Sequence, residues 1–307
     1  MSDVNGSGVG FDTVYGVDFS GAKLAGRNIW VARLELPRAR YPGQHPVPVP
    51  VRGGPKGRGK PALVELSSLE QLTGTPERAP ALAHLVDLIA RSERALWAMD
   101  FPFSLPIEVM PANSTWPDQL AFLHGADDDA YGVGLECLER AKRLGGPMHI
   151  RRQTDFDARA PFDCYHYRII YQFFHGVRDV LGPLWGTRGT AVLPFQYRRL
   201  ARARRVLVEA CPSSTLKRLG LPHQNYKQPA GGPLSPKRLR TRRVLLDALC
   251  RLARIGDRHR RVMMRNPGGD AIDAVLAAVG GLQSWRLTDH RAVARHARYP
   301  REGFLYV

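Results

Sequence analysis

Residues 79–101, APALAHLVDLIARSERALWAMDF, contain the pattern that decides the fold class. Over 79–91 the apolar residues recur at helical spacing, whereas 95–101 is an almost uninterrupted apolar run that includes Asp100 near its end. A helix that leads directly into a buried strand is typical of a parallel crossover, because parallel strands are covered by helices on both faces. We therefore expect an α/β fold in which strand 95–101 is central in the sheet.

Four more strands are expected around this unit, at Thr13–Phe19, Asn28–Leu36, Ala62–Leu66 and Arg205–Ala210. The second of these alternates apolar and polar residues, and its short connection to the first predicts an antiparallel hairpin. The third is short, so we expect it at the sheet edge. The fourth is again apolar and carries an acid, Glu209, near its end.

Helices are expected over 129–144, 164–181, 213–219, 235–254 and 270–279, with a last helix that ends near residue 298. Residues 37–61 are rich in proline, glycine and basic residues, which predicts a flexible basic loop. The segment of about 107–200 reads as a helical insertion between the fourth and fifth strands. We expect one domain over 1–307.

The positive charge is concentrated in the second half of the chain. The 307 residues include 45 Lys and Arg against 28 Asp and Glu, a formal charge of +17. Residues 1–150 carry 15 basic and 17 acidic side chains, whereas 151–307 carry 30 and 11. This asymmetry favours an anionic partner, for which nucleic acid is the main candidate. The alternative is an arginine-rich surface that serves solubility.

Several classes of protein do not fit the composition. With 44% hydrophobic and 24% charged residues the chain is of the globular type. No apolar run is long enough for a membrane span, and the polar start lacks the apolar core of a secretory signal. The four cysteines form no C-x-x-C pair and the histidines form no H-E-x-x-H motif, so a zinc site is not expected. We expect a cytoplasmic protein.

Acidic residues lie at the ends of three expected strands and at the start of one helix. These residues are Asp18, Asp100, Glu209 and the pair Asp270 and Asp273. The carboxyl ends of parallel strands meet at one sheet edge, where ligands bind in α/β folds. Neighbouring carboxylates repel unless a cation neutralises them, and an oxygen-only set selects Mg²⁺ or Mn²⁺. The pattern predicts a metal site suited to phosphodiester cleavage.

Each acid also has a simpler interpretation. Asp18 and Asp100 could bond to turn amides, Glu209 could pair with Arg202, Arg204 or Arg205, and Asp270 could cap its helix. Asp273 lies inside an otherwise apolar helix, where an unpaired acid is costly. For this reason it is the strongest single candidate.

Seven segments occur in the order of the motifs of a known family: GVDFSGAK (16–23), WAMDFPFSLP (97–106), RRQTD (151–155), VEACPSSTLKRLGLP (208–222), NYK (225–227), GDAIDAVLAAV (269–279) and EGFLYV (302–307). Over most of its length the chain resembles domain-of-unknown-function family 429 (DUF429), which is described as predicted nucleases with a ribonuclease H-like fold. The resemblance implies a mixed five-stranded sheet of order 3-2-1-4-5, with strand two antiparallel to the rest and helices on both faces.

The resemblance also implies a set of site residues. The acids of ribonuclease H-like enzymes fall on Asp18, Asp100 and the Asp270/Asp273 pair, and Glu209 matches an E-x-x-P-S/A pattern of the family. Lys227 of the NYK motif is a candidate phosphate contact or electrostatic stabiliser. The implied activity is hydrolysis of DNA or RNA phosphodiester bonds with Mg²⁺ or Mn²⁺.

Basic residues cluster near several aromatic ones in the second half. The basic stretches are 198–205, 237–243 and 251–265, and the neighbouring rings that could stack on bases are Trp185, Phe195, Tyr197 and Tyr226. The first hypothesis is a nuclease, with no membrane and no small-molecule cofactor. The alternative is a non-catalytic nucleic-acid-binding protein that retains the fold. A sugar-kinase-like phosphotransferase lacks the required phosphate loops, and Ser20 lacks a G-x-S-x-G elbow.

Overall fold

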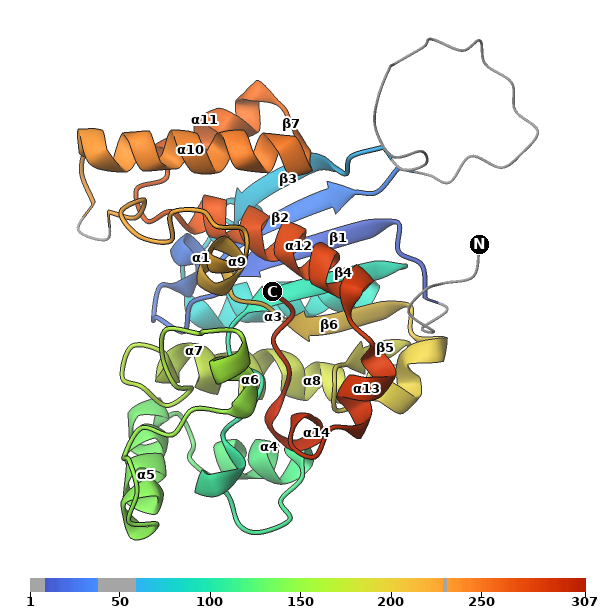
Figure 1. The fold of residues 1–307 in the computed structure, drawn as a ribbon, viewed down its shortest axis with the longest axis vertical. Helices are drawn as coiled ribbons and strands as arrows, with labels where there is room; N and C mark the ends of the chain where they lie inside the picture. The colour runs from blue at the N-terminus through green and yellow to red at the C-terminus, as the bar shows by residue number, and fades with distance from the viewer. Residues whose placement is uncertain (1–8, 38–58, 229–230) are drawn as a thin grey trace.

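A mixed sheet of seven strands lies at the centre of the described chain (Figure 1). The structure is a computed structural model that describes residues 9–37, 59–228 and 231–307. The strands are β1 (Thr13–Asp18), β2 (Trp30–Glu35), β3 (Ala62–Ser68), β4 (Ala95–Asp100), β5 (Thr190–Val192), β6 (Arg205–Glu209) and β7 (Arg254–Ile255). They lie side by side in the order β5-β6-β4-β1-β2-β3-β7. The expectation of a mixed α/β fold is confirmed.

Strand directions follow the chain connections. β2 is antiparallel to β1 and β3, whereas β4 is parallel to β1 and to β6. The expected count of five strands is wrong, because β5 and β7 add three and two residues at the two edges. Strands this short leave no readable alternation in the sequence. β3 is therefore not the edge strand that we expected, since β7 pairs with Ala62 and Leu63.

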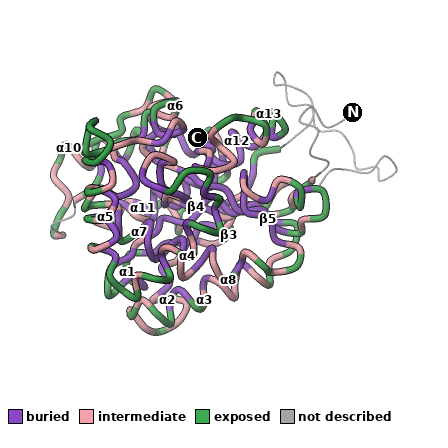
Figure 2. Tube along the Cα trace, turned by 90° about the horizontal axis from the view of Figure 1, so that it is seen from below, coloured by how far each residue is buried: buried purple, intermediate pink, exposed green. Residues whose placement is uncertain are grey.

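The helices surround the sheet. They are α1 (Ala25–Asn28), α2 (Leu69–Thr73), α3 (Arg78–Arg91), α4 (Trp116–His124), α5 (Ala130–Arg143), α6 (Gln153–Asp157), α7 (Ile170–His175), α8 (Gly182–Trp185), α9 (Pro212–Arg218), α10 (Pro236–Leu252), α11 (Asp257–Arg265), α12 (Asp270–Leu287), α13 (His290–Arg295) and α14 (Tyr299–Glu302). Short 3-10 helices cover 107–109 and 197–202, and a π-helix covers 176–181. Strands lie mostly in the buried interior, and exposed residues concentrate in the outer helices and loops (Figure 2).

Each face of the sheet packs against its own hydrophobic core. Leu96 and Ala98 of β4 belong to the core shared with α12, whereas Trp97 and Met99 belong to the core shared with α3 and the insertion. Alternate side chains of a strand point to opposite faces, so a strand buried on both sides is apolar throughout. The uninterrupted run at 95–101 is explained by this position.

A glycine brings α12 unusually close to β1. A Cβ atom on Gly16 would lie 2.0 Å from the carbonyl oxygen of Ala274, so no other residue fits without displacing the helix. Further along α12, a Cβ atom on Gly281 would lie 2.5 Å from the Cβ of Ala98. These contacts fix the first turn of α12 beside the carboxyl end of β1.

The insertion between β4 and β6 contains helices α4 to α8 and, at its end, strand β5. The helix that we expected over 164–181 is wrong in its first part, because α7 begins at Ile170 after a series of turns. The Asp163 side chain accepts a hydrogen bond from the amide of Tyr165 and so favours a turn there. Of the loop predicted at 37–61, residues 38–58 lie outside the described residues. In the described ranges, no helix has both the length and the apolar character needed to cross a membrane.

Candidate metal centre

Three of the predicted acids come together at one edge of the sheet. Asp18 is the last residue of β1 and Asp100 the last of β4, and the two are paired in the parallel register. Asp273 lies in the first turn of α12. One carboxylate oxygen of each residue lies within 4.8 Å of the others. These three residues, called here the acidic triad, could hold a metal ion.

The local sequence explains why the triad forms. The register of β1 and β4 places their terminal acids side by side, as the parallel pairing requires. Gly269 precedes α12 with a left-handed φ of 88°, a conformation that glycine adopts without strain. The turn it forms, together with the close approach at Gly16, directs Asp273 towards the end of β1. Asp273 is 1% exposed and Asp18 is 7% exposed.

The triad holds its negative charge at an electrostatic cost. Burial raises the pKa of Asp18 well above its ordinary value, and the Asp273 carboxylate raises it further while Lys227 opposes the rise. Burial, followed by the charge of Asp273, raises the pKa of Asp100 to about 7. Like charges in a desolvated site favour protonation unless a cation is bound. The triad therefore has the electrostatics of a cation site.

Lys227 and Tyr226 complete the surroundings of Asp273. The Tyr226 hydroxyl donates a 2.8 Å hydrogen bond to Asp273 Oδ1, and the Lys227 ammonium forms an ion pair with Asp273 Oδ2. Burial acts to lower the pKa of Lys227, but the carboxylates of Asp273 and Asp18 outweigh burial and raise it well above its ordinary value. Lys227 is thus a charged neighbour of the triad.

Asp270 lies outside the triad. It is the first residue of α12, and its Oδ2 accepts a 3.3 Å hydrogen bond from the Asn266 side chain. The helix-capping interpretation does not hold either, because Gly269 occupies the N-cap position. Asp270 acts on the site from a distance, since its charge contributes to the raised pKa of Asp18.

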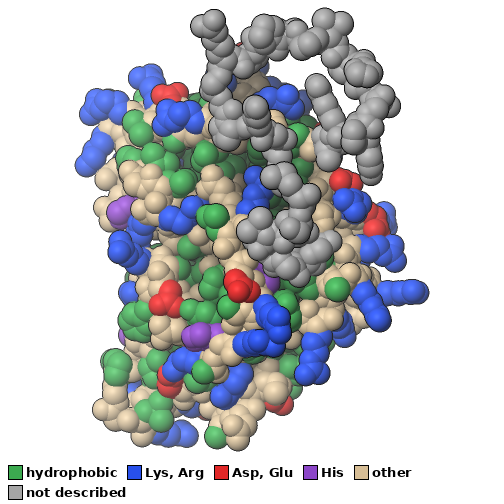
Figure 3. Space-filling view, turned by 45° about the vertical axis from the view of Figure 1, so that its right-hand side comes forward, with side chains coloured by type: hydrophobic (Ala, Val, Ile, Leu, Met, Phe, Trp, Pro, Cys, Tyr) green, Lys and Arg blue, Asp and Glu red, His purple; other side chains and the backbone are tan. Residues whose placement is uncertain are grey.

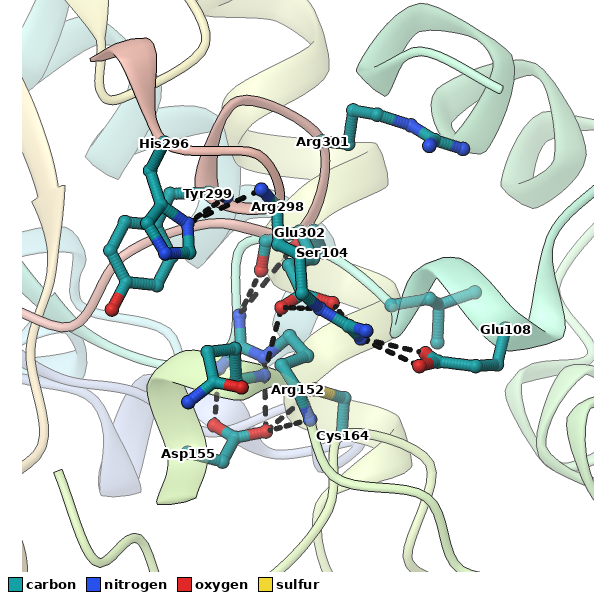
Figure 4. A network of polar contacts seen from close by, with 12 residues as sticks. Ser104, Glu108, Arg152, Asp155, Cys164, His296, Arg298, Tyr299, Arg301 and Glu302 are labelled. Atoms are coloured by element: carbon teal, nitrogen blue, oxygen red, sulfur yellow. Dashed lines mark hydrogen bonds and ion pairs between the residues drawn. The ribbon is translucent and has the colours of Figure 1, made fainter. Parts of the chain in front are cut away.

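Glu209 is bound to an arginine of the insertion. Arg152 donates to the two carboxylate oxygens of Glu209 at 2.8 and 2.5 Å, and to Asp155 at 2.7 Å. All three side chains are at most 2% exposed. Figure 4 shows the part of this network around Arg152 and Asp155, beside a second set that joins Arg298 to Glu302 and Glu108. Glu209 does pair with an arginine, but with Arg152 rather than with the sequence neighbours that we considered.

A cavity of about 550 Å³ opens beside the triad. Its wall includes the triad and Lys227, with Phe101, Phe162, Gln172, Lys217, Arg238 and Leu305 among the other residues. Residues from the insertion, from α9 and from the last segment thus enclose a space at the sheet edge. This volume is within the range of roughly 300–1,000 Å³ that is usual for ligand sites.

The chemistry of the lining suits a hard divalent cation. The grouped ligand atoms are all carboxylate oxygens, which favour Mg²⁺ or Mn²⁺ over softer metals. Cys211 also lines the cavity, but burial and the charge of Asp100 raise the pKa of its thiol to about 12. A protonated thiol is a poor metal ligand. The residues present therefore fit an oxygen-bound ion.

Three of the rings that we expected to stack on bases are instead packed against the hydrophobic cores. Trp185 stacks on Trp116 at 4.3 Å between ring centroids, and Phe195 also packs on Trp116. Tyr226 is 4% exposed and holds Asp273. The role of Tyr226 next to the triad was not predicted, although its place beside Lys227 in the NYK motif was a usable signal.

Comparison of the chain with protein-family models, with curated proteins and with solved structures returns no match.

Proposed function

We propose that this chain is a Mg²⁺- or Mn²⁺-dependent nuclease with a ribonuclease H-like fold. The observation that carries the proposal is the acidic triad, in which acids from β1, β4 and α12 place three oxygens within 4.8 Å. The strands β3-β2-β1-β4-β6 within the sheet, with β2 antiparallel to its neighbours, support the fold assignment. The resemblance of the sequence motifs to DUF429 points in the same direction.

In this proposal Asp18, Asp100 and Asp273 hold the ion. When bound, Mg²⁺ or Mn²⁺ supplies positive charge to phosphate oxygens and lowers the pKa of a coordinated water. The chain supplies the positioning: Tyr226 fixes the orientation of Asp273 through its hydroxyl. Lys227 places a positive charge at the same carboxylate, where it can attract a phosphate group.

Positive side chains elsewhere on the cavity wall favour an anionic substrate. Lys217 and Arg238 line the cavity, and Arg238 is held by a 2.6 Å hydrogen bond to the carbonyl of Lys227. On the face shown in Figure 3, Lys and Arg side chains are widespread and Asp and Glu are fewer. Such a surface attracts the phosphates of a nucleic acid in a salt-dependent way.

The test is cleavage of labelled DNA and RNA, each single-stranded and duplex, with Mn²⁺, with Mg²⁺ and with EDTA. We expect metal-dependent cleavage that falls by about a hundredfold or more in Asp18→Asn and Asp273→Asn, because loss of an outer-shell partner alone costs about 10–100-fold. Asp270→Asn is the matched control, since it changes the same charge in the same helical turn outside the triad. Cleavage that is retained in Asp18→Asn would overturn the assignment.

A non-catalytic nucleic-acid-binding protein is the second candidate. It is favoured by the ion pair between Lys227 and Asp273, because an internal cation already neutralises part of the triad. This function predicts salt-dependent binding without a metal requirement, and binding by Asp18→Asn that equals or exceeds that of the wild type. Nucleic-acid binding without cleavage of any labelled substrate would favour it.

A further inference from the structure

A row of aromatic rings leads from the acidic cavity to the protein surface. Phe162 lines the cavity, His166 stacks on it with ring centroids 4.6 Å apart, and Tyr167 follows at 4.5 Å from His166. The outermost ring, Tyr167, is 62% exposed. These three residues, called here the aromatic row, lie in the turns that precede α7, and for His166 and Tyr167 the sequence pattern had suggested a helix.

An arginine accompanies the row along its length. The Arg168 guanidinium lies 5.8 Å from the ring centroid of Phe162 and 5.5 Å from that of Tyr167. Its Nε donates a 3.0 Å hydrogen bond to the Tyr167 hydroxyl. Within the described ranges, Arg168 forms no ion pair with an acid. Its charge is therefore available to a ligand that lies on the rings.

A second exposed ring lies in the neighbouring segment. Phe156 is 61% exposed, and the guanidinium of Arg151 lies 6.0 Å from its centroid. Phe156 directly follows Asp155, which lines the cavity. Two arginine-flanked aromatic side chains are thus exposed on segments that form the cavity wall.

This combination fits unpaired nucleotides better than a duplex. Bases stack on aromatic side chains at about 1–3 kcal/mol each, and arginine adds cation–π and phosphate contacts. In a double helix the base faces are covered by neighbouring pairs and cannot reach such rings. The cavity of about 550 Å³ has the size of an ordinary ligand site, so it has room for a nucleotide-sized group beside the triad.

We propose that the aromatic row binds the unpaired bases of a single-stranded nucleic acid whose backbone enters the cavity beside the triad. This assigns a substrate class to the proposed nuclease site and rests on that proposed function. A protein segment that covers the same rings is the competing occupant, and it is an outcome of the test below.

The experiment measures binding in EDTA, so that it is independent of cleavage. Fluorescence anisotropy is recorded with a labelled oligothymidylate, with a labelled mixed-sequence strand and with that strand in a duplex. We expect single strands to bind at least about tenfold more tightly than the duplex, and Tyr167→Ala to weaken single-strand binding by about tenfold. Phe156→Ala is expected to weaken it as well.

The matched control is Tyr131→Ala in α5, because Tyr131 is an exposed tyrosine, 53% accessible, that does not line the cavity. Tyr167→Phe keeps the ring and is expected to bind as the wild type does. Arg168→Gln gives an independent readout, since it should reduce both the affinity and the salt dependence. Thermal unfolding of each variant verifies that it is folded.

Equal affinity for single strand and duplex would overturn the inference, as would equal losses in Tyr167→Ala and Tyr131→Ala. Absence of nucleic-acid binding by the folded wild type would also overturn it and favour a protein partner. Failure of the nuclease proposal alone gives a different result: single strands bind in a way that depends on Tyr167, but no metal-dependent cleavage is observed. Cleavage that requires the triad but is unchanged in Tyr167→Ala would support the nuclease proposal and overturn the proposed role of the aromatic row.

Discussion

Replacement of Asp100 with asparagine is expected to stabilise the metal-free protein at alkaline pH. Burial and the nearby Asp273 carboxylate raise the pKa of Asp100 from 3.8 to about 7 in the folded state. Asparagine keeps the shape and a hydrogen-bonding group for the neighbouring Asp18, but it carries no charge. In EDTA the variant removes a negative charge that Lys227 offsets only in part.

The sign and size follow from the two pKa values. Between pH 3.8 and about 7 the unfolded chain has lost the Asp100 proton while the folded chain keeps it, so the free energy of unfolding falls as the pH rises through this interval. Each unit of pKa difference corresponds to about 1.4 kcal/mol. The rise from 3.8 to about 7 therefore lowers the free energy of unfolding by roughly 4 kcal/mol at pH 8. Because Asp100 is partly exposed, solvent screening reduces the expected value towards about 2 kcal/mol.

The assay is urea unfolding in EDTA at pH 5 and pH 8, for the wild type and for Asp100→Asn. We expect the variant to be more stable than the wild type by about 2–4 kcal/mol at pH 8, with a smaller difference at pH 5. Addition of Mn²⁺ should stabilise the wild type and leave the variant nearly unchanged. A variant that is less stable than the wild type at pH 8 in EDTA would refute the electrostatic account of the triad.

Three further outcomes are expected. The affinity for Mn²⁺, measured by calorimetry, should weaken by up to about tenfold for each pH unit below 7, because Asp100 must release its proton before it can bind the ion. Equal affinity at pH 6 and pH 8 would contradict this expectation. Arg152→Met should reduce the free energy of unfolding by about 3–5 kcal/mol in urea titrations, since Glu209 and Asp155 would stay buried without their partner; a loss below about 1 kcal/mol would show that the network is dispensable. Burial lowers the pKa of His290 to about 4, so as the pH falls from 6.5 to 4 the unfolded chain takes up a proton before the folded chain does, and the free energy of unfolding decreases. This decrease should be smaller in His290→Gln. Identical pH profiles of unfolding for the two proteins would count against this expectation.

Two of the triad acids could be predicted because they depend on short-range rules. The apolar runs that end near Asp18 and Asp100 show where strands stop, and parallel pairing then places both at one edge. Asp273 was predicted because burial of an unpaired charge in an apolar helix is energetically unfavourable, so the side chain needs a partner. The partners it has, Tyr226 and Lys227, are separated from it by more than forty residues and left only a weak signal.

The remainder of the site depends on contacts that no local pattern records. Arg152 lies 57 residues before Glu209 in the chain, and nothing in the spacing indicates that the two meet. His166 and Tyr167 of the aromatic row were missed because residues 164–181 read as one helix, whereas a hydrogen bond from the Tyr165 amide to the Asp163 side chain favours a turn there, and α7 begins only at Ile170. In both cases a side chain from the insertion determines the local structure. The packing of the insertion depends on tertiary contacts, which a local sequence pattern does not record.

The ion pair of Lys227 with Asp273 affects which ions could bind at the triad. A lysine ammonium carries the same charge as Na⁺ or K⁺, and its attachment to the chain gives it an effective concentration at the carboxylate on the order of millimolar or more. A monovalent ion would bring no more charge to the carboxylates than the ammonium already does. A divalent ion would have twice the Coulomb attraction to the three acids and could compete with the ammonium for Asp273. The lysine would thus act as an internal competitor that discriminates between ions by their charge.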